Sequence, residues 1–204
     1  MVNDSEAILF LPGASGNRDF WRPVSDRLRH PATRRFIGYP GLGGMPVEEE
    51  VSRFDDLITR VTRAMTGPVD LIAQSMGGVI AVRAALERPE LVRRLVLSVT
   101  SGGIDLSSFG AADWRAGFRA QNPTAPRWFT DDRTDLTARL AEIRVPVLLL
   151  WGDADPISPP FVGERLSSLL PHAELHIIEG GTHDFANSRA YKVAPLIDKH
   201  LASL

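Results

Sequence analysis

The sequence contains no cysteine among its 204 residues. Disulfides, thiolate zinc sites and a cysteine nucleophile are therefore excluded, while the redox compartment stays open. No apolar run approaches the roughly 20 residues that a membrane-spanning helix needs. The first residues, Met-Val-Asn-Asp-Ser-Glu, lack the basic and apolar parts of a secretory signal. We therefore expect a cytoplasmic protein.

The chain also lacks a large excess of charge of either sign, since it contains 23 Lys and Arg and 25 Asp and Glu, which gives a net charge of -2. This balance gives no indication of a nucleic-acid or anionic-membrane partner. No two histidines have the spacing of metal ligands on a predicted helix, and the glycine loops lack the lysine of a phosphate cradle. We expect no metal and no cofactor. The expected partner is a small-molecule substrate, and homo-oligomerisation is left open.

What is present is an alternation of short apolar runs with longer segments of helical period. Because the runs do not alternate apolar with polar residues, they predict a mostly parallel sheet covered on both faces. The length suits one domain, residues 1–204. The predicted strands are Ala7–Leu11, Arg35–Ile37, Val69–Ala73, Leu91–Val99, Val145–Trp151 and Ala173–Ile178. The predicted helices are Phe20–Leu28, Val47–Met65, Gly77–Glu87, Pro160–Leu169 and Ala190–Leu204.

Residues 101–135 interrupt this rhythm. They are rich in Gly, Ser, Asp and Pro, yet they contain the aromatic residues Phe109, Trp114, Phe118, Trp128 and Phe129. A long segment with weak secondary-structure signals inside a compact domain is typical of a functional insertion. We interpret it as a short lid. The alternative is a loop whose aromatic side chains only anchor it to the core.

Ser75 stands between a predicted strand and a predicted helix, in the stretch Ala73-Gln74-Ser75-Met76-Gly77-Gly78. The serine could cap the helix, or it could be a nucleophile at the carboxyl end of a strand, where ligands of parallel sheets gather. The small residues Ala73 and Gly77 let strand and helix approach closely. This stretch resembles the nucleophile elbow of the α/β-hydrolase family, Gly-x-Ser-x-Gly, with Ala73 in place of the first glycine.

The family supplies a base and an acid later in the chain, in the order serine, acid, histidine. Gly180-Gly181-Thr182-His183, which follows the last predicted strand, resembles its histidine loop. The stretch from Gly152 to Asp155 is similar to its Gly-x-x-Asp acid turn, which makes Asp155 the expected partner and Asp153 the second choice. The other four histidines are interpreted as surface or packing residues: His30, His172, His176 and His200.

The resemblance also implies donors for an oxyanion, which are the backbone N–H groups of Met76 and Ala14. Ala14 lies in the stretch from Leu11 to Gly16, similar to the family's His-Gly-x-x-Gly segment with Pro12 replacing the histidine. We expect an apolar substrate pocket and place no arginine or lysine in it. The expected substrate-binding residues are Ala14, Ser15, Met76, Trp114, Phe118, Trp128 and Ile157.

The resemblance therefore implies a three-layer α/β-hydrolase fold with about six strands, without the N-terminal hairpin of the full fold, and with a short lid. It implies a serine hydrolase that cleaves an ester or related acyl bond of a small, largely apolar substrate through Ser75, His183 and Asp155. Thioesterase, lactonase, C–C hydrolase and cofactor-free peroxidase chemistry stay open. So does a non-catalytic binding protein of the same fold.

Overall fold

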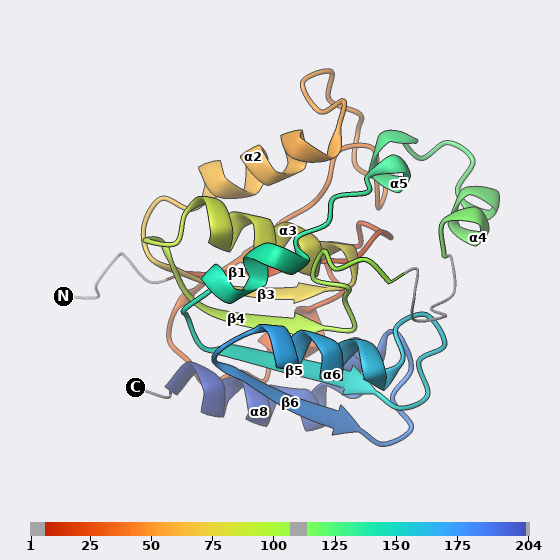
Figure 1. Ribbon diagram of the computed structural model, residues 1–204. Coiled ribbons are helices and arrows are strands. Elements are labelled where there is room, and N and C mark those ends of the chain that lie inside the picture. Colours follow the sequence, from red (N-terminus) through yellow and green to blue (C-terminus); the bar gives the residue numbers. More distant parts are fainter. Residues whose placement is uncertain (1–6, 107–113, 203–204) are drawn as a thin grey trace.

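A computed structural model describes residues 7–106 and 114–202 of the chain. Within them, six strands form one sheet in the order β2-β1-β3-β4-β5-β6, and all neighbours are parallel. The chain runs from β1 outward to β2 and then returns to β3 on the other side of β1. Figure 1 shows the strands from β1 to β6 that follow on that side. The strands are β1 (Ala7–Leu11), β2 (Thr33–Phe36), β3 (Val69–Gln74), β4 (Val92–Ser98), β5 (Val147–Gly152) and β6 (Ala173–Ile178).

The central strands are buried on both faces. Every residue of β1, β3 and β5 is buried, whereas the edge strands β2 and β6 include exposed residues. Strands of this kind have continuous apolar sequences, which is why the sequence located them. The predicted, mostly parallel sheet of about six strands is confirmed, and β1 and β6 have the predicted bounds.

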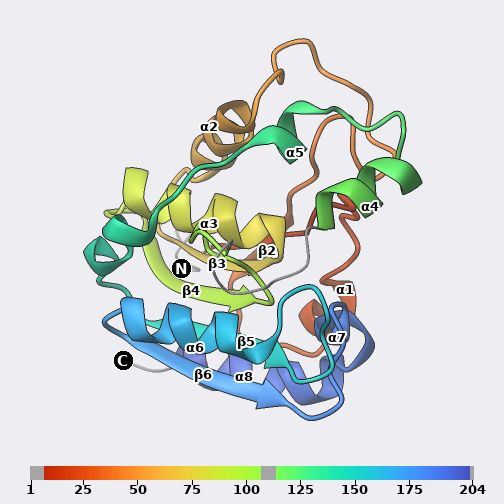
Figure 2. The ribbon, with the colours of Figure 1, turned by 45° about the vertical axis from the view of Figure 1, so that its right-hand side comes forward.

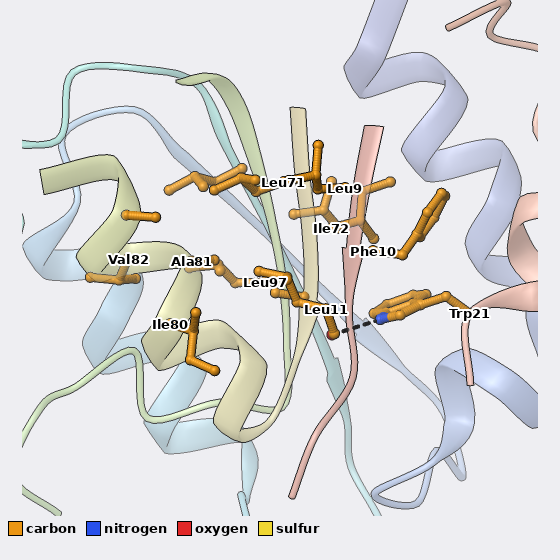
Figure 3. Packing of buried hydrophobic residues seen from close by; sticks show 14 of the residues in the cluster. Leu9, Phe10, Leu11, Trp21, Leu71, Ile72, Ile80, Ala81, Val82 and Leu97 are labelled. Atoms are coloured by element: carbon orange, nitrogen blue, oxygen red, sulfur yellow. Dashed lines mark hydrogen bonds between the residues drawn. The ribbon is translucent and has the colours of Figure 1, made fainter. Parts of the chain in front are cut away.

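Helices cover both faces of the sheet. Ile80, Ala81 and Val82 of α3 lie on one side of the central strands, and Trp21, just before α1, lies on the other (Figure 3). Helix α6 packs on β5 and β6, while α1 lies beside α7 and α8 (Figure 2). The helices are α1 (Arg22–Ser25), α2 (Phe54–Ala64), α3 (Met76–Glu87), α4 (Trp114–Gln121), α5 (Trp128–Asp131), the 3-10 helix η2 (Thr137–Glu142), α6 (Pro160–Leu169), α7 (Phe185–Ser188) and α8 (Ala190–Ala202).

Two predicted helices are shorter than expected. The apolar period predicts a helix from Val47, which is seven residues too early, since α2 begins only at Phe54. The Asp56 carboxylate accepts hydrogen bonds from the backbone N–H groups of Ser52 (2.9 Å) and Arg53 (3.1 Å). This capping interaction sets the start of the helix. The predicted helix Phe20–Leu28 is reduced to the four residues of α1, and η2 was not predicted.

The segment 101–135 contains the two short helices α4 and α5, which lie beyond the carboxyl ends of the strands (Figure 1). Phe109, one of its predicted lid aromatics, falls outside the described residues. In residues 7–106 and 114–202, no helix has both the length and the apolar character needed to span a membrane.

Candidate active site

Ser75 occupies a sharp turn between β3 and α3. Its backbone has φ 52° and ψ -122°, a conformation that an L-residue other than glycine adopts only under strain. The Ser75 N–H donates to the Ser98 carbonyl at 2.9 Å. A Cβ on Gly77 would lie 2.4 Å from the Pro12 carbonyl oxygen, so only glycine fits there. Because the Ser75 hydroxyl makes no capping hydrogen bond with α3, the helix-cap interpretation is wrong.

The Ser75 hydroxyl meets His183 instead. His183 lies in the loop between β6 and α7, and its Nε2 is 3.1 Å from Ser75 Oγ. This loop packs against the end of β5, where a Cβ on Gly152 would lie 2.1 Å from the Gly181 carbonyl oxygen. The same oxygen accepts a hydrogen bond from Ala154 N at 3.0 Å. The close backbone contact brings the histidine loop over the ends of the neighbouring strands.

Asp155 completes the arrangement on the far side of the imidazole. Its Oδ2 is 2.7 Å from His183 Nδ1, and its Oδ1 accepts the N–H groups of Ile157 (2.8 Å) and Ser158 (3.2 Å). Asp155 as a whole is only 3% exposed, so its carboxylate oxygens are satisfied by hydrogen bonds within the protein rather than by water. With Nδ1 donating to Asp155, Nε2 is left as the acceptor for the Ser75 hydroxyl.

The second-choice acid, Asp153, has a different partner. Its Oδ1 accepts the N–H of Gly180 at 2.5 Å, which holds the start of the histidine loop. Among the other histidines, His176 pairs with Glu174 on β6 at 2.8 Å. His30 Nδ1 accepts the N–H of Ala32 at 3.3 Å. These contacts agree with the surface and packing roles expected for His30 and His176.

The loop from Leu11 to Gly16 lies beside Ser75, and two buried aromatic side chains hold it. Trp21 Nε1 donates to the Leu11 carbonyl at 3.0 Å, drawn as the dashed line in Figure 3. The Tyr39 hydroxyl donates to the Pro12 carbonyl at 2.9 Å. Burial raises the pKa of Tyr39 well above its ordinary value, so the hydroxyl keeps the proton that it donates. The sequence suggested the loop but not the donor role of Tyr39.

A cavity of about 530 Å³ opens above Ser75 and His183. Three of the predicted substrate-binding residues, Met76, Trp114 and Ile157, line it. Its other apolar lining residues are Phe54, Val79, Val99, Ile104, Leu106 and Phe129.

The other four predicted substrate-binding residues are not part of this lining. Phe118 and Trp128 pack against Phe129, with ring centroids 5.1 and 6.0 Å away. Ser15 is exposed, and Ala14 is half-buried in the loop after β1. The aromatic side chains of the segment thus pack around Phe129, and Trp114 and Phe129 line the cavity.

Charged side chains also line the cavity, which corrects the expectation that no arginine lies there. They are Arg115 and Arg133, together with Asp105, Asp132 and Asp135. Arg115 Nε and Arg133 Nη1 both donate to the Thr130 carbonyl, at 3.1 and 2.8 Å. The lining of the cavity thus combines apolar side chains with side chains of both charges. In residues 7–106 and 114–202, no cluster of three or more His, Asp or Glu is arranged to hold a metal ion.

Comparison with protein families gives matches over most of the chain. Residues 8–138 match a model described as the alpha/beta hydrolase family, and residues 123–186 match a second one described as the alpha/beta hydrolase fold. A poly(3-hydroxyalkanoate) depolymerase of Ectopseudomonas oleovorans is 27% identical, over 95% of this chain and 83% of its own. A pimeloyl-[acyl-carrier protein] methyl ester esterase of Neisseria meningitidis is 23% identical, over 90% of this chain and 88% of its own.

Solved structures share the fold at low sequence identity. An esterase from Thermogutta terrifontis superposes with a TM-score of 0.78 at 19% identity, covering 97% of this chain and 89% of its own. A hydrolase from Pseudomonas aeruginosa gives a TM-score of 0.81 at 19% identity, with coverages of 99% and 92%.

Proposed function

Because this chain belongs to the α/β-hydrolase family, we propose that it is a serine hydrolase that cleaves esters or related acyl bonds of small, largely apolar substrates. The observation that carries the proposal is the continuous line of hydrogen bonds from Ser75 Oγ through His183 to Asp155. A serine hydroxyl becomes a useful nucleophile only when such a base removes its proton.

In the proposed mechanism, Ser75 Oγ attacks the substrate carbonyl carbon while its proton passes to His183 Nε2. Asp155 stabilises the imidazolium through Nδ1. The imidazolium then returns the proton to the leaving alcohol, which departs and leaves an acyl group on Ser75. Water, deprotonated by His183, attacks this acyl group, and the acid is released as Ser75 Oγ takes the proton back from His183. The negative oxygen of each tetrahedral intermediate is stabilised by the N–H groups of Met76 and Ala14, each worth about two to three orders of magnitude in rate.

The cavity supports an acyl or aryl group beside Ser75, because Met76, Val99 and Ile157 present apolar surface there. The charged lining residues Arg115 and Arg133 would contact a polar end of the substrate. The relatives whose names describe esterases and a depolymerase agree with acyl transfer as the reaction class.

The test is hydrolysis of p-nitrophenyl esters of increasing chain length by wild type and by Ser75→Ala. We expect Ser75→Ala to lower kcat by roughly 10⁴-fold or more, as in other enzymes of this kind. Ser101→Ala is the matched control, since Ser101 lines the same cavity but its Oγ accepts the Gly103 N–H instead. A fluorophosphonate probe should label wild type and the control, and not Ser75→Ala. Near-full activity of Ser75→Ala would refute the proposal and favour a binding protein.

A further inference from the structure

Gln74, the last residue of β3, is a buried amide directly before Ser75. It is only 5% exposed. An apolar residue would fill this place without desolvating a polar group, and a buried amide is tolerated only when hydrogen bonds compensate for the lost water. The partners of Gln74 therefore show what its amide does for the structure.

The amide nitrogen of Gln74 binds the histidine loop. Nε2 donates to the main-chain carbonyl of His183 at 3.1 Å, joining two positions 109 residues apart in the chain. Because a carbonyl oxygen can only accept, the side-chain group that faces it must be the NH₂. This hydrogen bond ties the backbone of His183 to the strand that carries Ser75.

The amide oxygen of Gln74 therefore points the other way, toward the loop after β1. A Cβ built on Gly13 would lie 2.2 Å from Gln74 Oε1 and 3.2 Å from Gln74 Cδ. The side chain thus rests directly against Gly13, next to Ala14. One carboxamide touches both the loop of the proposed base and the loop of a proposed oxyanion donor.

We propose that Gln74 is a positioning residue that sets the distance between His183 and Ser75 and the place of the Gly13–Ala14 backbone. The inference rests on the proposed function, because it concerns the same reacting atoms. A displacement of about 1 Å in such a site can lower the rate about 100-fold. Gln74 makes these contacts without touching the substrate, so its removal affects kcat and leaves KM nearly unchanged.

The first test replaces the amide by an apolar side chain of similar length, Gln74→Met. We expect kcat on a p-nitrophenyl ester to fall by about 10- to 100-fold, with KM within about twofold. Tm should fall by only about 2–4 °C, as for the loss of one hydrogen bond in a chain of this size. Gln121→Met is the control, because Gln121 is the other glutamine of the chain and is exposed on α4.

The second test does not depend on how well Gln74→Met folds. Gly13→Ala keeps the amide but forces a methyl group against Gln74 Oε1, and it should lower kcat strongly. In a Gln74→Ala background that oxygen is absent and only the milder 3.1 Å contact with Ser75 Cβ remains. The same substitution should therefore have a smaller effect there, since contacting residues are not additive. Equal effects of Gly13→Ala in both backgrounds, or a Gln74→Met enzyme with wild-type kcat, would overturn the inference.

The two proposals fail in different ways. If Ser75→Ala remains active, the hydrolase mechanism is wrong, whatever Gln74→Met does. If Ser75→Ala is inactive while Gln74→Met retains wild-type kcat, only the positioning role of Gln74 is wrong.

Discussion

Val99, directly after β4, has φ 43°. The left-handed region is strongly disfavoured for a β-branched residue, and such strain is worth about 1–3 kcal/mol. Val99 is nevertheless 1% exposed, donates its N–H to the Leu150 carbonyl at 3.1 Å and lines the cavity. Val96 in β4 is also 1% exposed but has no such strain, so it is a matched control.

The comparison of Val99→Gly with Val96→Gly isolates the strain. Val96→Gly loses burial worth about 1.5–3 kcal/mol and adds about 0.5–1 kcal/mol of glycine backbone entropy, so we expect roughly 2–4 kcal/mol of destabilisation. Val99→Gly loses similar burial, but glycine accepts a positive φ without strain. Relief of the backbone strain offsets about 1–3 kcal/mol of the lost burial. We therefore expect the free energy of unfolding to fall by only about 0–2 kcal/mol.

Urea unfolding followed by circular dichroism measures both variants, and equal m-values make the midpoints comparable. The expected result is a Val99→Gly midpoint clearly above that of Val96→Gly. If both substitutions lower the free energy of unfolding equally, the backbone at Val99 is not strained and the reasoning fails. Val99→Gly should also enlarge the cavity and shift the preferred ester toward a bulkier acyl group.

Two further predictions concern other parts of the molecule. Gly152→Ala should lower kcat by at least about tenfold, because its methyl group would lie 2.1 Å from the Gly181 carbonyl oxygen and displace the histidine loop. Gly117→Ala is the control and should leave kcat unchanged, because no atom lies within 4 Å of the added Cβ. Burial and the charge of Arg94 lower the pKa of His200, with Glu174 opposing. The unfolded chain therefore binds a proton on His200 at a higher pH than the folded chain does. The stability contributed by neutral His200 is fully present above the unfolded pKa of about 6.5, and it is lost as the pH falls toward the lower pKa of the folded state. In His200→Gln the urea midpoint should change less between pH 7.5 and 5.5 than it does in wild type. The same pH dependence of the midpoint in both proteins would contradict this prediction.

The strands and the proximity of Ser75, Asp155 and His183 could be predicted because both follow from local sequence and one topological rule. Buried parallel strands are continuous apolar runs, and residues that follow them meet at one edge of the sheet. Ser75 and Asp155 follow the buried strands β3 and β5, and His183 follows the edge strand β6. Their proximity needed no knowledge of side-chain packing, and the structure brings them within hydrogen-bond distance.

The start of α2 and the lining of the cavity could not be predicted in this way. Val47 fits the helical period but is 72% exposed in a loop, because the Asp56 carboxylate caps the helix at a later position. The spacing of apolar residues does not show at which residue a helix is capped. Arg115 and Arg133 come from a segment without regular period, and their place depends on how α4 and α5 sit over the strand ends. Such contacts are set by tertiary packing alone.

Pro12 shows how a local difference from a family pattern can be compensated from elsewhere. The family's loop has a histidine where this chain has a proline, which offers neither a polar side chain nor a backbone N–H. The Pro12 carbonyl is instead held by Tyr39, 27 positions away, and the Leu11 carbonyl by Trp21. Both aromatic side chains are completely buried, so the two carbonyls are fixed in direction before any substrate binds. The N–H groups that follow them in the loop are then oriented by the backbone itself, which explains how a proline can occupy this position without leaving the loop unsupported.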